Sequence, residues 1–149
     1  MISKILVPTD GSKTSYKAAR YAVDLAKKLR VPIVALSVID KRAFMAQTVP
    51  ASKATRHIIE PIEDYLQEAA ESYVGKIKKM CGQKGVASKT SVKWGSPVEE
   101  IEKAAKSSKA NLIVMGSRGR SALSATVLGS VSYGVIQNTK GTPVLIIRG

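Results

Sequence analysis

The sequence is poor in residues that form disulfides or bind transition metals. Its 149 residues include one cysteine, Cys81, and one histidine, His57. One thiol cannot form an intrachain disulfide, and these two residues cannot supply the Cys and His ligands of a structural zinc site. The low content of cysteine and histidine therefore excludes a domain stabilised by disulfides and a Cys/His zinc module.

Long apolar runs are also missing. No stretch of about eighteen apolar residues occurs, so the sequence predicts no membrane-spanning helix. The first residues, MISKILVPTDGS, are apolar over too short a length to form the hydrophobic region of a signal peptide. With no export signal and a single thiol, we expect a cytoplasmic protein.

Acidic residues are scarce, and they are unevenly placed. Asp and Glu number 11 against 24 Lys and Arg, which gives a formal net charge of +13. No acid follows Glu102, but that part of the chain carries Lys103, Lys106, Lys109, Arg118, Arg120, Lys140 and Arg148. The C-terminal third is therefore expected to attract anions. Nucleic acid is an alternative partner rather than the expected one, because aromatics are only 5% and no RNA- or DNA-binding module is recognisable.

The rest of the composition is that of a globular protein, with 44% hydrophobic and 23% charged residues. This length predicts one domain over residues 1–149. Short apolar runs alternate with amphipathic segments, which indicates the order βαβαβαβαβ. Expected strands cover residues 4–7, 33–39, 86–92, 111–115 and 144–147, and expected helices cover 12–29, 61–80, 96–108 and about 130–140. Uniformly apolar strands in this order predict an α/β fold with a parallel sheet between two helical layers.

Three local signals sharpen the expected boundaries. Pro61 suits the first turn of the second helix. Ser96-Pro97-Val98-Glu99 has the pattern of a capping box, and Gly141 is expected to end the last helix. Residues 41–56 show no clear period and are longer than most connections.

Two segments follow strands at the edge where parallel sheets bind ligands. The first is Pro8-Thr9-Asp10-Gly11-Ser12. One interpretation is that Asp10 or Ser12 caps the following helix. The other is that the Asp10 carboxylate accepts hydrogen bonds from ribose or holds a hydrated Mg²⁺ ion. Position in the sequence does not decide between them.

The second segment is rich in glycine and contains no acid. Its spacing is Gly116-x2-Gly119-x9-Gly129-Ser130, and it leads into a helix. Glycines let backbone N–H groups approach an anion, the helix start adds its dipole, and Arg118 and Arg120 add charge. The alternative is a flexible loop with solvated arginines. The spacing is neither a Walker A loop nor a G-x-G-x-x-G fingerprint.

This glycine spacing, with VPTDGS near the start and TPVLII near the end, resembles the universal stress protein family in its ATP-binding branch. The resemblance extends from Ile5 to Ile147. It implies a Rossmann-like fold, similar to the adenine nucleotide alpha hydrolases, with a five-stranded parallel sheet in the order 3-2-1-4-5. It also implies ATP lying across strands one and four, together with Mg²⁺ or Mn²⁺.

By position, the resemblance assigns site roles to several residues. Pro8, Thr9 and Asp10 would lie near the ribose and the metal, with Asp10 as metal ligand, and the Val38 backbone would read adenine. Phosphate and ribose contacts would come from Met115, Gly116, Arg118, Gly119, Gly129, Ser130, Val131 and Ser132. Arg118 departs from the family pattern, since many relatives have His there, and arginine should tighten the contact with an anion.

The expected function is that of an ATP-binding stress-response regulator rather than a fast enzyme. Hydrolysis of ATP needs a base or a positioned water with a metal and counter-charges, and no catalytic constellation is visible, so slow turnover is the most we expect. The apolar strand 144–147 would lie at a sheet edge and is expected to pair with a second copy in a homodimer. Alternatively, residues 41–56 cover that edge and leave a monomer. An unidentified protein partner is also expected.

Overall fold

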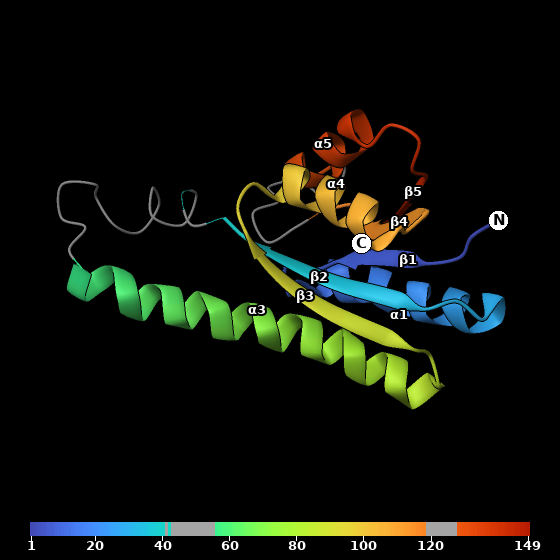
Figure 1. Ribbon diagram of the computed structural model, residues 1–149, viewed down its shortest axis with the longest axis horizontal. Helices are drawn as coiled ribbons and strands as arrows, with labels where there is room; N and C mark the ends of the chain where they lie inside the picture. The colour runs from blue at the N-terminus through green and yellow to red at the C-terminus, as the bar shows by residue number, and fades with distance from the viewer. Residues whose placement is uncertain (41, 43–55, 119–127) are drawn as a thin grey trace.

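The computed structural model describes residues 1–40, 42, 56–118 and 128–149. Its strands form one parallel sheet in the order β3-β2-β1-β4-β5, as predicted. The strands are β1 (Ile5–Pro8), β2 (Ile33–Ile39), β3 (Ser88–Trp94), β4 (Leu112–Gly116) and β5 (Val144–Ile147). The helices are α1 (Lys13–Leu29), α3 (Arg56–Lys84), α4 (Pro97–Ser108) and α5 (Ser130–Asn138). Figure 1 shows α1 and α3 on one face of the sheet and α4 and α5 on the other.

The two helical layers bury the sheet on both faces. Successive residues of a strand point to opposite faces. In β1, Ile5 and Val7 therefore pack with the small residues of α1, while Leu6 packs with α4 and α5 through Ile101 and Val135. Because both sets are buried, the central strands read as continuous apolar runs rather than as alternating ones. This is why the sequence could predict a parallel sheet.

Several boundaries differ from the sequence-based expectation. The helix α3 begins at Arg56, so Pro61 lies inside it and not in its first turn. The strand β3 covers Ser88–Trp94 instead of 86–92, because Val86 belongs to the buried turn before it. The expected segment 41–56 lies outside the described residues except for Arg42 and Arg56.

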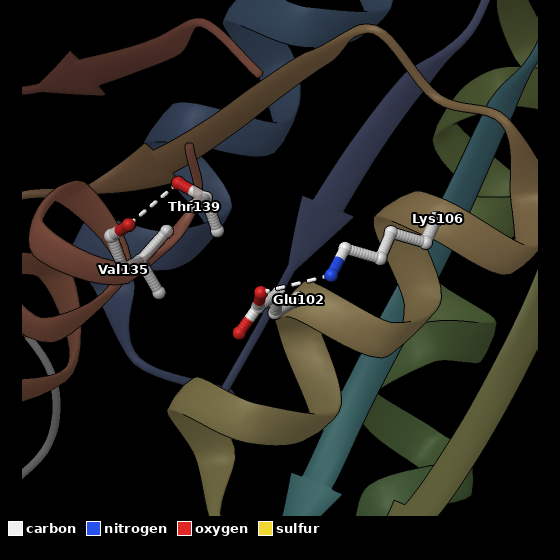
Figure 2. Close-up of polar contacts among 4 residues, drawn as sticks. All are labelled: Glu102, Lys106, Val135 and Thr139. Atoms are coloured by element: carbon white, nitrogen blue, oxygen red, sulfur yellow. Dashed lines mark hydrogen bonds and ion pairs between the residues drawn. The ribbon is translucent and has the colours of Figure 1, made fainter. Parts of the chain in front are cut away.

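The expected helix caps are also corrected. Ser96 is the N-cap of α4, but its side chain makes no capping hydrogen bond, so the capping box does not form. Acidic residues in the first turn, Glu99 and Glu100, compensate the helix dipole there instead. The helix α5 ends at Asn138, where the buried Thr139 hydroxyl donates to the Val135 carbonyl (Figure 2).

The single cysteine is a structural residue. Cys81 is fully buried on α3, and desolvation raises the pKa of its thiol. The thiol is therefore protonated at neutral pH and acts as a small hydrophobic group, as its place on the apolar stripe predicts. In the part of the chain that the structure describes, no helix is both long and apolar enough to cross a bilayer.

Candidate functional site

The two predicted segments meet at the carboxyl edge of the sheet. The strands β1 and β4 are neighbours. From β1 the chain turns into α1 on one face, and from β4 it continues toward α5 on the opposite face (Figure 1). A reversal of this kind is the topological switch point at which open α/β sheets bind ligands. The segment after β1 and the start of α5 therefore lie on the two sides of this switch point, which we call the crevice.

Thr9 holds the turn after β1 through a chain of hydroxyl groups. The Gly11 N–H donates to Thr9 Oγ1 at 3.1 Å, and Thr9 Oγ1 lies 2.8 Å from Ser15 Oγ. Ser15 Oγ donates to the Ser12 carbonyl at 2.9 Å. Since the Ser15 hydrogen is directed to Ser12, Thr9 must donate to Ser15. The Thr9 side chain is buried and serves the turn itself, and the Pro8 residue before it belongs to β1.

Ser12 and Asp10 both satisfy donors at the start of α1. Ser12 is the N-cap, and its hydroxyl accepts from the Ser15 N–H at 3.2 Å. The Asp10 carboxylate accepts from the Ser12 N–H at 3.0 Å in a local turn. Ser12 therefore caps α1, whereas Asp10 stabilises the turn just before the helix. A carboxylate in such a turn can also coordinate a cation through its oxygens.

A residue that sequence reasoning missed supports this turn from another element. Gly11 has φ +80°, and a Cβ at that position would lie 2.4 Å from Cε1 of Tyr73 on α3. The Tyr73 ring therefore lies directly against the Gly11 backbone. The contact joins residues more than sixty positions apart in the chain, so only the folded chain could reveal it.

Gly116, at the end of β4, is required by packing. A Cβ there would lie 2.8 Å from Thr14 Cγ2 and 3.1 Å from the Thr14 carbonyl carbon. The missing side chain lets the first turn of α1 lie against β4. The Gly116 carbonyl accepts from the buried hydroxyl of Ser132 at 2.7 Å, which fixes α5 to the strand. The predicted site residue Gly119 lies outside the described residues.

Gly129 is the N-cap of α5, and its conformation does not call for glycine. Its φ of −62° and ψ of 154° nearly match the −76° and 160° of Ser12. Its N–H donates to the Ser117 carbonyl at 2.7 Å, which closes the base of the glycine loop. Without a side chain, Gly129 cannot cap the N–H groups of the first turn, and no acid lies in that turn. Ser130 is exposed and Val131 half-buried at this start.

Arg118, which is half-buried, adds a positive group close by. Its Nε is shielded from solvent and has no hydrogen-bond acceptor among the described residues. A Cβ built on Gly149 would lie 2.5 Å from Arg118 Nη2 and 2.9 Å from Thr14 Oγ1. The guanidinium thus lies between the end of the chain and the first turn of α1. Burying such a donor without an acceptor is unfavourable, so an anionic acceptor at this place would stabilise it.

Val38 and Met115 occupy different environments. The Leu36 carbonyl accepts from the Thr9 N–H, so alternate residues of β2 direct their backbone groups toward β1. Val38, two residues later, directs its N–H and C=O to the same side, beyond the end of β1 at Pro8. Met115 is buried among the residues packed against α4 and α5, and its side chain contributes to the core rather than to the crevice.

Protein ligands for a metal are few in the described residues, where no group of three or more His, Cys, Asp or Glu side chains could hold an ion. A Ca²⁺ site built from protein oxygens alone would need more ligands than this. A Mg²⁺ ion that keeps several waters and binds substrate phosphates needs only one or two carboxylates. Asp10 can provide one of them.

The fold defines a class of protein: a Rossmann-like α/β protein with a five-stranded parallel sheet. The chain belongs to the universal stress protein family, whose family model matches residues 1–148. It is 36% identical over 99% of its length to universal stress protein MJ0531 of Methanocaldococcus jannaschii, covering 83% of that protein. It is 35% identical to YxiE of Bacillus subtilis, over 99% of this chain and 100% of the relative.

Solved structures agree with this assignment. The structure of MJ0577 from Methanocaldococcus jannaschii has a TM-score of 0.82 and 31% identity, covering 99% of this chain and 96% of that one. Two universal stress protein structures were solved as complexes, one with cAMP and one, from Archaeoglobus fulgidus, with dAMP. Their TM-scores are 0.67 and 0.62, with identities of 23% and 21%. Each complex covers 99% of this chain, and 97% and 99% of the other chain respectively. At that identity they show a shared fold.

Proposed function

We propose that this chain binds ATP at the carboxyl edge of the sheet and acts as a nucleotide-dependent regulator. The observation that carries the proposal is the start of α5. Gly129 has the backbone conformation of a serine N-cap but no side chain, so no described side chain caps the first-turn N–H groups on the crevice side. A helix start of this kind binds phosphate through its N–H groups and its dipole.

Arg118 supports an anionic ligand independently of the helix. Its buried Nε has no acceptor among the described residues, and a phosphate oxygen would supply one. The adenine nucleotides bound to other universal stress proteins support the choice of ligand class. The spacing from Gly116 to Ser130 supports ATP within that class, by resemblance.

The metal would be held by the nucleotide and by Asp10. When bound with the nucleotide, Mg²⁺ or Mn²⁺ supplies charge neutralisation for the phosphates. Asp10 is held in place by the Ser12 N–H, so its carboxylate is already oriented before a metal arrives. Val38 would present its backbone groups to the base, because they point past the end of β1.

Isothermal titration calorimetry of ATP with Mg²⁺ tests the site. Gly129→Val places a branched side chain in front of the α5 donors and should weaken binding at least about 100-fold, as expected for losing one or two charge-assisted hydrogen bonds. Gly82→Val is the matched control, because nothing lies within 4 Å of a Cβ at that exposed helical position. If Gly129→Val binds ATP as the wild type does, the assignment is wrong.

Rapid hydrolysis is not part of the proposal. A single-turnover assay with ATP in the presence of Mg²⁺ should show bound ATP remaining intact over many minutes. Conversion to ADP within seconds would indicate an enzyme whose catalytic group is not among the crevice residues described above.

We also propose that β5 forms the interface of a homodimer. The β5 residues carry no charge, and all four are only half-buried, whereas the opposite edge strand β3 carries the exposed Lys89 and Lys93. Charged side chains of this kind protect an edge from pairing, and β5 has none. A second copy paired along β5 would provide hydrogen-bond partners for the outward backbone groups of this edge strand.

The register of β5 gives a sharp test of this interface. The carbonyls of Pro143 and Ile147 accept from β4 and the residue after it, so Val144 and Ile146 direct their N–H groups away from β4. Ile146→Pro therefore removes an outward donor without removing a bond to β4. Sedimentation equilibrium should show a dimer for the wild type and a monomer for this variant. A wild-type monomer, or an unchanged dimer in the variant, would place the interface elsewhere or exclude it.

A further inference from the structure

The parallel topology gathers basic residues at the edge of the sheet opposite the crevice. In a parallel α/β sheet every helix ends, and every strand begins, at the amino edge, which lies on the right in Figure 1. A cation precedes each strand there. In the order of the sheet these residues are Lys84, Arg30, Lys4, Lys109 and Lys140. We call this row the amino-edge face.

Two of these cations have a left-handed backbone conformation, in which glycine is the preferred residue. The helices α1 and α4 end at Arg30 and Lys109, which have φ values of 58° and 61°. They are the only non-glycine residues with positive φ in the described part of the chain. The equivalent turns before β3 and β5 use Gly85 and Gly141, at φ +72° and +86°. Glycine is the preferred residue there, so folding alone does not account for Arg30 and Lys109.

The charge at this face is only partly neutralised within the chain. Lys84 lies 3.8 Å from Asp24, and Lys4 donates to the Ser108 carbonyl at 2.7 Å. Lys106, in the last turn of α4, is paired with Glu102 at 3.1 Å (Figure 2). By contrast, Arg30, Lys109 and Lys140 are exposed and form no ion pair within the described ranges. Three cations of the row are therefore available to a partner.

We propose that the amino-edge face binds the phosphate backbone of single-stranded nucleic acid. Neighbouring strands lie about 4.8 Å apart, so the row extends about 20 Å across the sheet, which suits a linear polyanion. Contacts with the phosphate backbone need neither a nucleic-acid-binding module nor stacking aromatic side chains. The scarcity of both in the sequence therefore argues against recognition of bases but not against this mode of binding. Exposed large apolar side chains near the row are confined to Met1, Leu29 and Ile136 among the described residues, so charge dominates this face and a membrane surface is the competing partner.

The variant Arg30→Gly/Lys109→Gly separates a functional role from a structural one. Glycine suits both turns, so the thermal midpoint should be unchanged or raised. Binding to a fluorescein-labelled 20-mer of uridylate should weaken about 25-fold at 0.1 M salt. The slope of log affinity against log salt should fall by about 1.4, which corresponds to two lost contacts with a single strand.

Matched variants decide what a loss of binding means. Lys17→Gln/Lys93→Gln removes the same charge from exposed positions away from this face and should weaken binding about threefold or less. An equal loss in both double variants would overturn the proposal, because net charge alone would explain it. Lys140→Gln keeps the backbone unchanged at a third position of the row and should lower affinity about fivefold.

Competing partners are tested with the same proteins. Vesicles of phosphatidylserine and phosphatidylcholine, and polyglutamate, should bind more weakly than the uridylate 20-mer at equal salt. If either binds more tightly and depends on Arg30 and Lys109, the face recognises that partner and the nucleic-acid proposal is wrong. No binding of the 20-mer at 0.05 M salt would also overturn it.

Discussion

The helices α1 and α5 begin on the two sides of the crevice with almost the same backbone and opposite side-chain chemistry. Ser12 and Gly129 are N-caps within about fifteen degrees of one another in both φ and ψ. Ser12 accepts from the Ser15 N–H, and Asp10 accepts from the Ser12 N–H. At α5 no side chain accepts, and the buried Arg118 Nε nearby has no acceptor in the described residues.

The difference shows which helix start has a capping side chain of its own. At α1 the Ser15 N–H is capped by Ser12, so this helix start has a cap supplied by the chain itself. The start of α4 is a third case, compensated by Glu99 and Glu100 in place of a capping side chain. Among α1, α4 and α5, whose N-caps are described, α5 is the one with neither a capping side chain nor an acid in its first turn. Its start is therefore where the proposed phosphate contacts fall.

The largest effect is expected where the turn before α1 contacts α3. Gly11→Ala should lower the free energy of unfolding by about 2–4 kcal/mol, because it adds left-handed strain and pushes against the Tyr73 ring. Urea denaturation measures the loss. The double variant Gly11→Ala/Tyr73→Ala removes the clash with the ring. Its loss of unfolding free energy should therefore be smaller than the sum of the losses in the two single variants. Strictly additive losses would mean that the ring does not support the turn.

The next effect separates the two roles of Asp10. Asp10→Asn keeps an oxygen that can accept from the Ser12 N–H but removes the charge. The thermal midpoint should therefore stay close to that of the wild type, while binding of ATP with Mg²⁺ weakens by about 1–3 kcal/mol. Calorimetry with and without Mg²⁺ checks this. If Asp10→Asn changes stability but not affinity, the carboxylate is a structural cap alone.

Removing the cap of α1 should affect the fold and not the ligand. Ser12→Ala loses the bond to the Ser15 N–H and should cost about 1 kcal/mol of stability. The ATP dissociation constant should change by less than about twofold, since Ser12 serves only its own helix. A large loss of affinity at unchanged stability would mean that the α1 start contacts the nucleotide directly.

The smallest effect on stability comes from making α5 resemble α1. Gly129→Ser fits the observed backbone and adds a capping hydroxyl, so stability should rise by a few tenths of a kcal/mol. The same hydroxyl would occupy the α5 donors and should weaken ATP binding several-fold. Thermal melts and calorimetry on one preparation measure both. Tighter binding would show that the donors are not the anion site.

The sequence by itself determined the order of elements, the parallel sheet and the two segments that form the crevice. Apolar runs such as residues 33–39 and the periodic pattern of α1 are local signals, and burial on both faces leaves them uninterrupted. The glycine spacing from Gly116 to Ser130 identified the resemblance to the family. Local pattern was less reliable in detail: Pro61 suits a helix start but lies inside α3, and α4 begins after Ser96 as predicted but without the capping hydrogen bond.

The tertiary structure alone decided what individual residues do, because their partners are distant in sequence. Gly116 is a glycine because Thr14 lies against it, and Gly11 is one because of its positive φ and the Tyr73 ring. Gly129 has an ordinary negative φ, so its backbone conformation does not require glycine. The row of cations likewise exists only once parallel strands bring all their starts to one edge. Sequence patterns report local burial and conformation, whereas these roles depend on contacts that form only when the chain folds.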